Sequence, residues 1–586
     1  MSTETRVRNG ADARELPACD LVMKGGITSG IVYPGLVKEL AREYRFANIG
    51  GSSAGAIAAA LCAAAEFGRQ TGRGRGMDTL DAAVKDLSDP AKLFGLFQPT
   101  PDTRPMFDVL TGALLAKGSK RKPVVSRVKR IRIAAVGAGR ARPAVPLIGL
   151  VLLAALVGLT TVAAYALFSG FFAVAVAVVA ALALLAVAVV ITVVVAFGLL
   201  LRRTQRSLGD SDYGFCPGTR QAGARQDAVV EWLHEQIQRC AGRTTEDAPL
   251  TFRELDDHGI RLTMLTTDLG FARPVRVPED IGRYRFDERE MCCRLPDTVV
   301  AAMLAARSQD DGPYKKMPDE DLPIVVGVRL SLSFPILMSA MPLWWIDDAG
   351  SEPRRHLLSD GGIGSNFPVH FFDSWFPRRP TFAIDLARYP DDGTGDVFML
   401  PDPREPAIPR WQPVDSLFAF LGDIKDTMQN WRDTMQSELP GFRDRVCQIR
   451  FEPGQGGLHL NMEEADITTL VKRGRQAGRE ILRTFTDQHW EQHRYVRYLT
   501  LMAQLQDNLH RARQPYEEFA PRLEQGLPCV GVYREGRDGA WCARAAQATA
   551  GILALGDQWG PPPLGIDLDG MGGPMPRPVM RIVPRA

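Results

Sequence analysis

Residues 46–68 read FANIGGSSAGAIAAALCAAAEFG, and this stretch decides the fold. It begins as a short apolar strand and continues as a helix of small residues. At the junction Ser53 stands in a G-x-S-x-G setting between Gly51 and Gly55. A sharp strand-to-helix turn exposes a serine only where its neighbours are small, and the helix N-terminus then directs free N–H groups toward it. Ser53 is therefore the candidate nucleophile of an acyl-transfer reaction.

A glycine-containing loop, KGGITSG at residues 24–30, follows the preceding apolar strand. Backbone amides of Gly25, Gly26 and Ile27 could stabilise a developing oxyanion, because glycines let the backbone approach a substrate. The segment matches neither the dinucleotide-binding pattern nor the P-loop, since Ile27 and Ile31 occupy positions that those patterns reserve for glycine and lysine. A plain turn is the alternative reading.

A third segment, HLLSDGG at residues 356–362, ends an apolar strand with Asp360, Gly361 and Gly362. A carboxylate there stands at the edge of a sheet, where the sites of α/β proteins collect. Strand-like and helix-like pieces alternate around these segments, which predicts a mostly parallel, helix-covered sheet. The expected strands are residues 19–26, 46–51, 260–269, 356–362 and 381–387, and the expected helices are residues 30–44, 54–68, 411–437 and 467–505.

Together, and in this order, the three segments resemble the signature of bacterial patatin-like phospholipases. The resemblance covers residues 17–389, and residues 326–342 look like the family's Ser- and Pro-containing helix beside the site. It implies a three-layer α/β fold and a Ser53–Asp360 dyad without histidine, with the amides near Gly25 stabilising the intermediate. The family loop usually has a third glycine and an arginine where this chain has Ile27 and Ser29.

Two other classes stay open. One is an α/β-hydrolase esterase with a Ser-Asp-His triad, for which His370 is the histidine close downstream of Asp360. That fold normally lays down more strands before its nucleophile than this chain has. The other is a membrane scaffold that keeps the fold without the chemistry, although the ordered serine, aspartate and glycines argue against it.

A long insertion separates Ser53 from Asp360. Residues 143–201 contain no charged side chain and divide at Ser169-Gly170 into stretches 145–168 and 171–201. Each exceeds the ~20 residues that a helix needs to cross a bilayer. Basic residues flank both outer ends, so the sequence predicts a transmembrane hairpin with both termini cytoplasmic. We expect a two-span protein of the inner membrane whose catalytic domain faces its lipid substrate from the cytoplasm.

Composition narrows the remaining classes. The 586 residues carry a net charge of +2, which argues against a nucleic-acid partner. Nine cysteines and eight histidines show no metal-ligand spacing, so we expect reduced thiols and hydrolysis without a metal or other cofactor. The beginning of the sequence has no apolar stretch of the kind found in a signal peptide. Oligomeric state, headgroup preference and any activating partner are left open.

The expected organisation has six parts. They are an N-terminal tail (1–16), the first part of the catalytic domain (17–116), the basic linker and hairpin (117–206), the second part of the catalytic domain (207–400), a mainly helical C-terminal region (401–557) and a Pro/Gly-rich tail (558–586).

Overall fold

The computed structural model describes residues 11–26, 29–73, 76–87, 89–115, isolated positions between 158 and 198, 201–306, 312–347, 352–389, 395–400, 414, 416–452, 455, 464–524 and 539–558. Apart from those isolated positions and Leu201, the expected spans at 145–168 and 171–201 lie outside the described residues, as do Ile27 and the tail after Gln558. Within the described part of the chain, no helix combines the length and the apolar character needed to cross a membrane.

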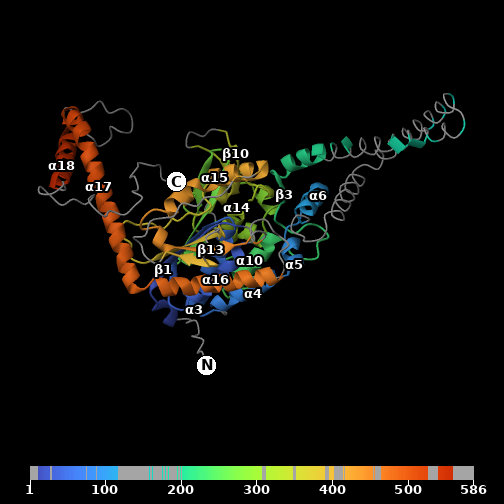
Figure 1. Cartoon of the computed structure of the whole chain (residues 1–586), viewed down its shortest axis with the longest axis horizontal. Coiled ribbons are helices and arrows are strands. Elements are labelled where there is room, and N and C mark those ends of the chain that lie inside the picture. Colours follow the sequence, from blue (N-terminus) through green and yellow to red (C-terminus); the bar gives the residue numbers. More distant parts are fainter. Residues whose placement is uncertain are drawn as a thin grey trace.

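The described strands build an 11-stranded sheet (Figure 1). Its order is β12 (Val397–Met399), β13 (Val446–Phe451), β11 (Thr381–Arg388), β1 (Ala18–Met23), β2 (Arg45–Ser52), β4 (Arg261–Asp268), β10 (Arg354–Asp360), β9 (Met341–Trp345), β6 (Arg285–Phe286) and β7 (Lys315–Lys316), with β5 (Arg273–Val277) also paired to β4. The five strands from β13 to β4 are parallel, and the strands outside them pair antiparallel. A separate parallel pair joins β3 (Gly214–Cys216) to β8 (Ile336–Met338).

The described helices cover this sheet and extend beyond it. They are α1 (Ala11–Arg14), α2 (Tyr33–Leu40), α3 (Ala54–Thr71), α4 (Leu80–Leu87), α5 (Pro90–Gly95), α6 (Arg104–Leu115), α10 (Val229–Cys240), α11 (Phe252–Asp256), α12 (Glu288–Cys292), α13 (Asp297–Ala305), α14 (Ile324–Ser331), α15 (Leu417–Ser437), α16 (Glu464–Thr484), α17 (Asp487–Glu524) and α18 (Gly539–Gln558). The mixed α/β fold with a parallel centre and a helical C-terminal region agrees with the sequence prediction.

Strand β1 shows why the parallel strands at the centre of the sheet are apolar. Leu21 and Met23 point into the large core, whereas Val22 joins a smaller apolar cluster that contains Phe367 and Phe442. Adjacent residues of a strand face opposite sides of its sheet, so both sides are buried here. A strand buried on both faces reads as a continuous apolar run, as this one does.

The C-terminal region is tied to the sheet by more than its helices. Strand β13 lies beside β11 inside the sheet, and α16 packs closely against α2. Gly474 makes this close approach possible, since a Cβ at that position would stand 1.9 Å from the Val32 carbonyl oxygen. The helix expected over residues 467–505 is divided between Thr484 and Asp487 into α16 and α17. Figure 1 shows α17 running away from the sheet and carrying α18 at its far end.

Candidate active site at the end of strand β2

Ser53 occupies the turn between β2 and α3. Its backbone has φ 55° and ψ −128°, a conformation that residues with a side chain rarely adopt. The Ser53 N–H donates to the Ser331 hydroxyl of α14 over 3.0 Å, which helps to hold this strained geometry. Strain of this kind persists where surrounding contacts impose it, and it is characteristic of a nucleophile elbow.

The two glycines of the motif are required by close backbone contacts. A Cβ on Gly51 would lie 2.3 Å from the Gly55 carbonyl oxygen, and a Cβ on Gly55 would lie 2.3 Å from the carbonyl oxygen of Met23. Real Cβ atoms do not approach backbone atoms so closely. The G-x-S-x-G spacing therefore lets α3 pack directly on the ends of β1 and β2.

Strand register brings Asp360 to the level of Ser53. Ser52 pairs with Leu265 on one side of β4, and Asp360 pairs with Thr266 on the other. Ser53, one residue beyond Ser52, is thus level with Thr266 and Asp360. The Asp360 N–H donates to the Ser333 carbonyl oxygen over 3.0 Å, so the end of α14 contacts Ser53 and the segment just after it contacts Asp360.

The Asp360 carboxyl group is 3% exposed, and burial raises its pKa to about 7, although the Ser53 side chain and the Gly362 amide favour the ionised form. One oxygen, Oδ1, accepts from the Gly362 N–H over 2.8 Å. The other, Oδ2, accepts no well-formed hydrogen bond from the described residues. A carboxylate with this pKa and a vacant lone pair is suited to take a proton near neutral pH.

The glycine loop lies over Ser53. A Cβ on Gly25 would contact Ser53 Cβ at 3.0 Å, so the two residues are neighbours. The Gly25 N–H already donates to the Asn366 carbonyl oxygen over 2.9 Å, which leaves Gly26 and Ile27 as candidate oxyanion donors. Gly26 lies just before the gap in the described residues that contains Ile27. The loop does contain a cation, Lys24, and this side chain pairs with Asp385 at 2.8 Å.

Helix α15 holds the loop that follows Asp360, a role that the sequence did not indicate. Gln429 donates to the Gly362 carbonyl oxygen over 2.7 Å. The buried Asp433 carboxylate accepts from the Ser365 hydroxyl and from the Asn366 and Phe367 amides over 2.7–2.8 Å. Burial raises the pKa of Asp433, while these donors and Lys24 oppose the shift. No motif marks either side chain, because each acts on a loop more than sixty residues away.

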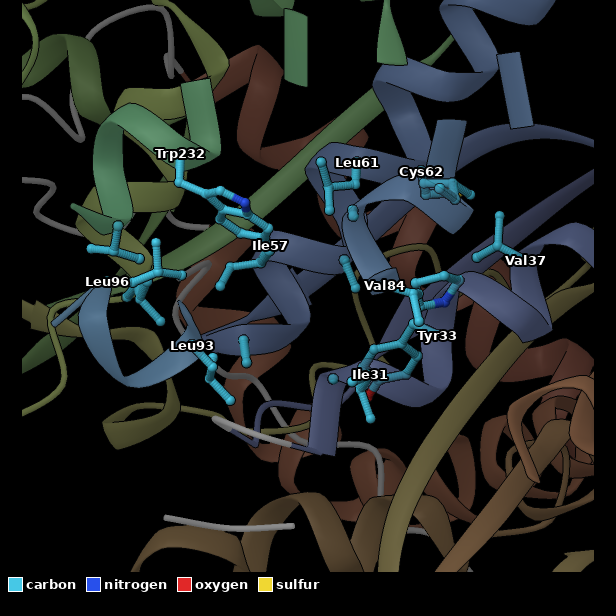
Figure 2. A pocket seen from close by; sticks show the side chains of 18 of the residues that line it. Ile31, Tyr33, Val37, Ile57, Leu61, Cys62, Val84, Leu93, Leu96 and Trp232 are labelled. Carbon is cyan, nitrogen blue, oxygen red and sulfur yellow. The ribbon is translucent and has the colours of Figure 1, made fainter. Parts of the chain in front are cut away.

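An apolar cavity begins beside Ser53, at Gly30 and Ala54. Figure 2 shows its walls, formed by side chains from α2, α3 and the neighbouring helices. Its lining includes Ile31, Tyr33, Val37, Ile57, Leu61, Cys62, Val84, Leu93, Leu96 and Trp232. The lining is almost entirely aliphatic and aromatic, as expected for a site that accepts a hydrocarbon chain.

His370 lies in a different hollow, which is polar and also lined by Arg276, Asp373 and Arg432. Burial and the nearby Arg432 lower the pKa of His370 to about 4. The groups that act on Asp360 are instead Ser53 and Gly362. Among the described residues, no group of three or more histidines, cysteines or acids could hold a metal ion.

Comparison with known proteins identifies the family of this chain. The family model for patatin-like phospholipases matches residues 21–145, a range that includes Gly25, Gly26 and Ser53 and ends before Asp360. The RpoH suppressor of Rhizobium meliloti (strain 1021) is 32% identical over 568 residues, covering 83% of this chain and 85% of that protein. Its name states no chemical activity.

One similar solved structure is VipD from Legionella pneumophila, at 12% identity over 92% of this chain and 85% of that one. The TM-score of this match is 0.28.

Proposed function

We propose that this chain, which belongs to the patatin-like phospholipase family, is a serine lipid acyl hydrolase with a Ser53–Asp360 dyad. The observation that carries the proposal is the strand register that sets a strained serine level with a buried carboxylate of pKa about 7. The apolar lining of the cavity beside Ala54 supports a substrate that carries a hydrocarbon group. Phospholipids, lysophospholipids and related esters fit this chemistry.

In the proposed reaction Asp360 accepts the proton of Ser53 as Oγ attacks the acyl carbonyl carbon. The amides of Gly26 and Ile27 and the N-terminal end of α3 stabilise the oxyanion. When the carbon–oxygen ester bond breaks, Asp360 returns the proton to the leaving alcohol. A water molecule, deprotonated by the same carboxylate, then releases the fatty acid and regenerates Ser53.

Lipidomics on cells that express the wild type or Ser53→Ala tests this proposal. The wild type should lower one class of lipid ester and raise the matching lyso-lipid or free fatty acid, and the variant should change neither. Equal lipid profiles, together with no esterase activity in the purified wild type, would favour the inactive scaffold.

We also propose that residues 143–201 anchor the protein at the cytoplasmic side of the inner membrane. The support is the charge-free composition with basic flanks. Cysteines placed at the exposed positions Arg73 and Arg220 should then both react from the cytoplasm, and one at Ser169 should react from the other side. Cytoplasmic reactivity at Ser169 would exclude the hairpin without touching the proposed chemistry.

A further inference from the structure

On helix α15, the large apolar side chains that the structure describes are exposed. Among the side chains that the structure describes on this helix, Asp433 is the buried one, at 3% exposure. Five large apolar side chains are exposed instead: Phe420 at 51%, Ile424 at 42%, Met428 at 75%, Trp431 at 57% and Met435 at 63%. We call these five residues the apolar stripe.

The stripe is continuous and faces away from the protein. With about 100° between successive residues of an α-helix, its five members fall within an arc of about 80°. Gln429 and Asp433, which bond the loop after Asp360, lie on the opposite side of the helix. Figure 1 shows α15 at the surface of the molecule.

This arrangement inverts the usual pattern of a surface helix. Such a helix normally buries its apolar face and exposes its polar one. Here polar side chains attach the helix to the protein, and an aromatic, aliphatic and methionine face remains in water. A contiguous exposed apolar face of this kind marks an interaction site.

We propose that the apolar stripe of α15 inserts into the surface of the lipid that the enzyme hydrolyses, and this inference rests on the proposed function. The placement favours lipid as the occupant, because α15 contacts Gly362, two residues from Asp360. Ile363, the next residue of that loop, is itself 41% exposed. Tryptophan and phenylalanine are suited to the boundary between headgroups and acyl chains. Arg432, which follows Trp431, is exposed and also lines the polar hollow of His370; its positive charge can attract lipid phosphate.

The same contacts couple lipid binding to the site. Insertion of the stripe fixes α15, and Gln429 and Asp433 fix residues 362–367 in turn. That loop carries the Gly362 amide that orients Asp360 and the Asn366 carbonyl oxygen that holds Gly25. Gln429 and Asp433 are therefore positioning residues, and contact of the stripe with lipid should raise the turnover of the enzyme.

An environment-sensitive fluorophore on α15 tests insertion independently of the chemistry. The label is attached to Met428→Cys, with Thr434→Cys as the control on the same helix outside the stripe, both in a Cys292→Ser/Cys293→Ser/Cys529→Ser background of the full chain. Vesicles of phosphatidylcholine and phosphatidylethanolamine should shift the emission to the blue at position 428 and much less at 434. The Ser53→Ala protein should give the same shift, so a failure of the proposed hydrolysis would not obscure the result.

No shift at position 428, or an equal shift at 434, would overturn the inference. A blue shift that depends on protein concentration without vesicles would overturn it too, because it would assign the stripe to a second copy of the chain.

Activity gives the second readout. Met428→Glu/Trp431→Glu should lower the ratio of vesicle hydrolysis to soluble-ester hydrolysis at least about tenfold, whereas Thr434→Glu should leave the ratio unchanged. An equal loss on both substrates would mean that the stripe is merely structural and would contradict the proposal.

Discussion

Helices α3 and α15 each hold one side of the candidate site, and they do so in opposite ways. α3 carries Ser53 at its N-terminus and is buried along its length, except at Ile57 and Thr71, which are half-buried. α15 holds the loop of Asp360 through Gln429 and the buried Asp433, while the five residues of its apolar stripe are exposed. Core packing fixes α3, whereas polar contacts to the loop after Asp360 hold the described part of α15.

This difference between α3 and α15 suggests that α3 serves stability and α15 serves regulation. A helix packed into a dense core cannot shift without loss of many contacts. A helix attached through a few hydrogen bonds belongs to the less stable part of a fold, from which moving elements are drawn. The nucleophile should therefore be preformed, and the loop of the base should be the part that responds to lipid.

The largest effect should come from Ser53→Ala. Removal of the nucleophile should lower esterase activity by roughly 10³-fold or more and abolish labelling by a fluorophosphonate, with the melting temperature unchanged. Ser52→Ala is the matched control, since the Ser52 hydroxyl is buried without a hydrogen-bond partner among the described residues. Labelling that persists in Ser53→Ala would move the nucleophile elsewhere.

Gly51→Ala should disturb the packing of α3 on the sheet. The added Cβ meets the Gly55 carbonyl oxygen at 2.3 Å, so the protein should lose about 2–3 kcal/mol of unfolding free energy along with its activity. Denaturant titration measures the change. Gly551→Ala in α18, where nothing lies within 4 Å, should be neutral or slightly stabilising. A Gly51→Ala protein as stable as the wild type would contradict the close packing of α3.

Asp433→Asn should weaken the attachment of α15 to the loop after Asp360, with a smaller effect on activity than Ser53→Ala or Gly51→Ala. An amide keeps only one acceptor oxygen. If that oxygen stays on the Asn366 and Phe367 N–H groups, the NH₂ group replaces the oxygen that accepts from Ser365, and the negative charge that strengthens all three bonds is lost. We expect about a tenfold lower kcat with little change in the melting temperature. Steady-state kinetics on a soluble ester and a thermal melt check both parts. A large drop in melting temperature would show that α15 is as much a part of the core as α3.

His370→Ala should have the smallest effect. The ring lies in the polar hollow, and the low pKa of His370, about 4, reflects burial and Arg432. Soluble-ester turnover should stay within about threefold of the wild type, because the proposed dyad needs no imidazole. A loss as deep as that of Ser53→Ala would instead support a Ser-Asp-His triad.

Local sequence patterns were enough to predict the strand, turn and helix around Ser53. The strand, the turn glycines and the small-residue helix around Ser53 are consecutive in the sequence, so their geometry follows from nearby residues. The approach of Asp360 was predicted only through the family resemblance. Its physical cause is the pairing of β10 with β4, a contact between strands about ninety residues apart.

The α15 side could not be predicted from the sequence. Helical periodicity indicated a helix over residues 411–437, and apolar spacing would ordinarily place its stripe inside the protein. In the structure the apolar stripe faces outward instead. The opposite face carries Asp433, which accepts from three donors in the loop at residues 365–367. Sequence spacing does not reveal a partner so far along the chain.

The pH dependence of acylation tests the central claim most directly. If Asp360, with a pKa of about 7, must be ionised to accept the proton of Ser53, the rate of fluorophosphonate labelling should rise with pH and level off above about pH 8. In Asp360→Asn the residual labelling should be slow and should lose this inflection. A wild-type profile that is flat between about pH 5 and 9, or an inflection that survives in Asp360→Asn, would contradict the dyad.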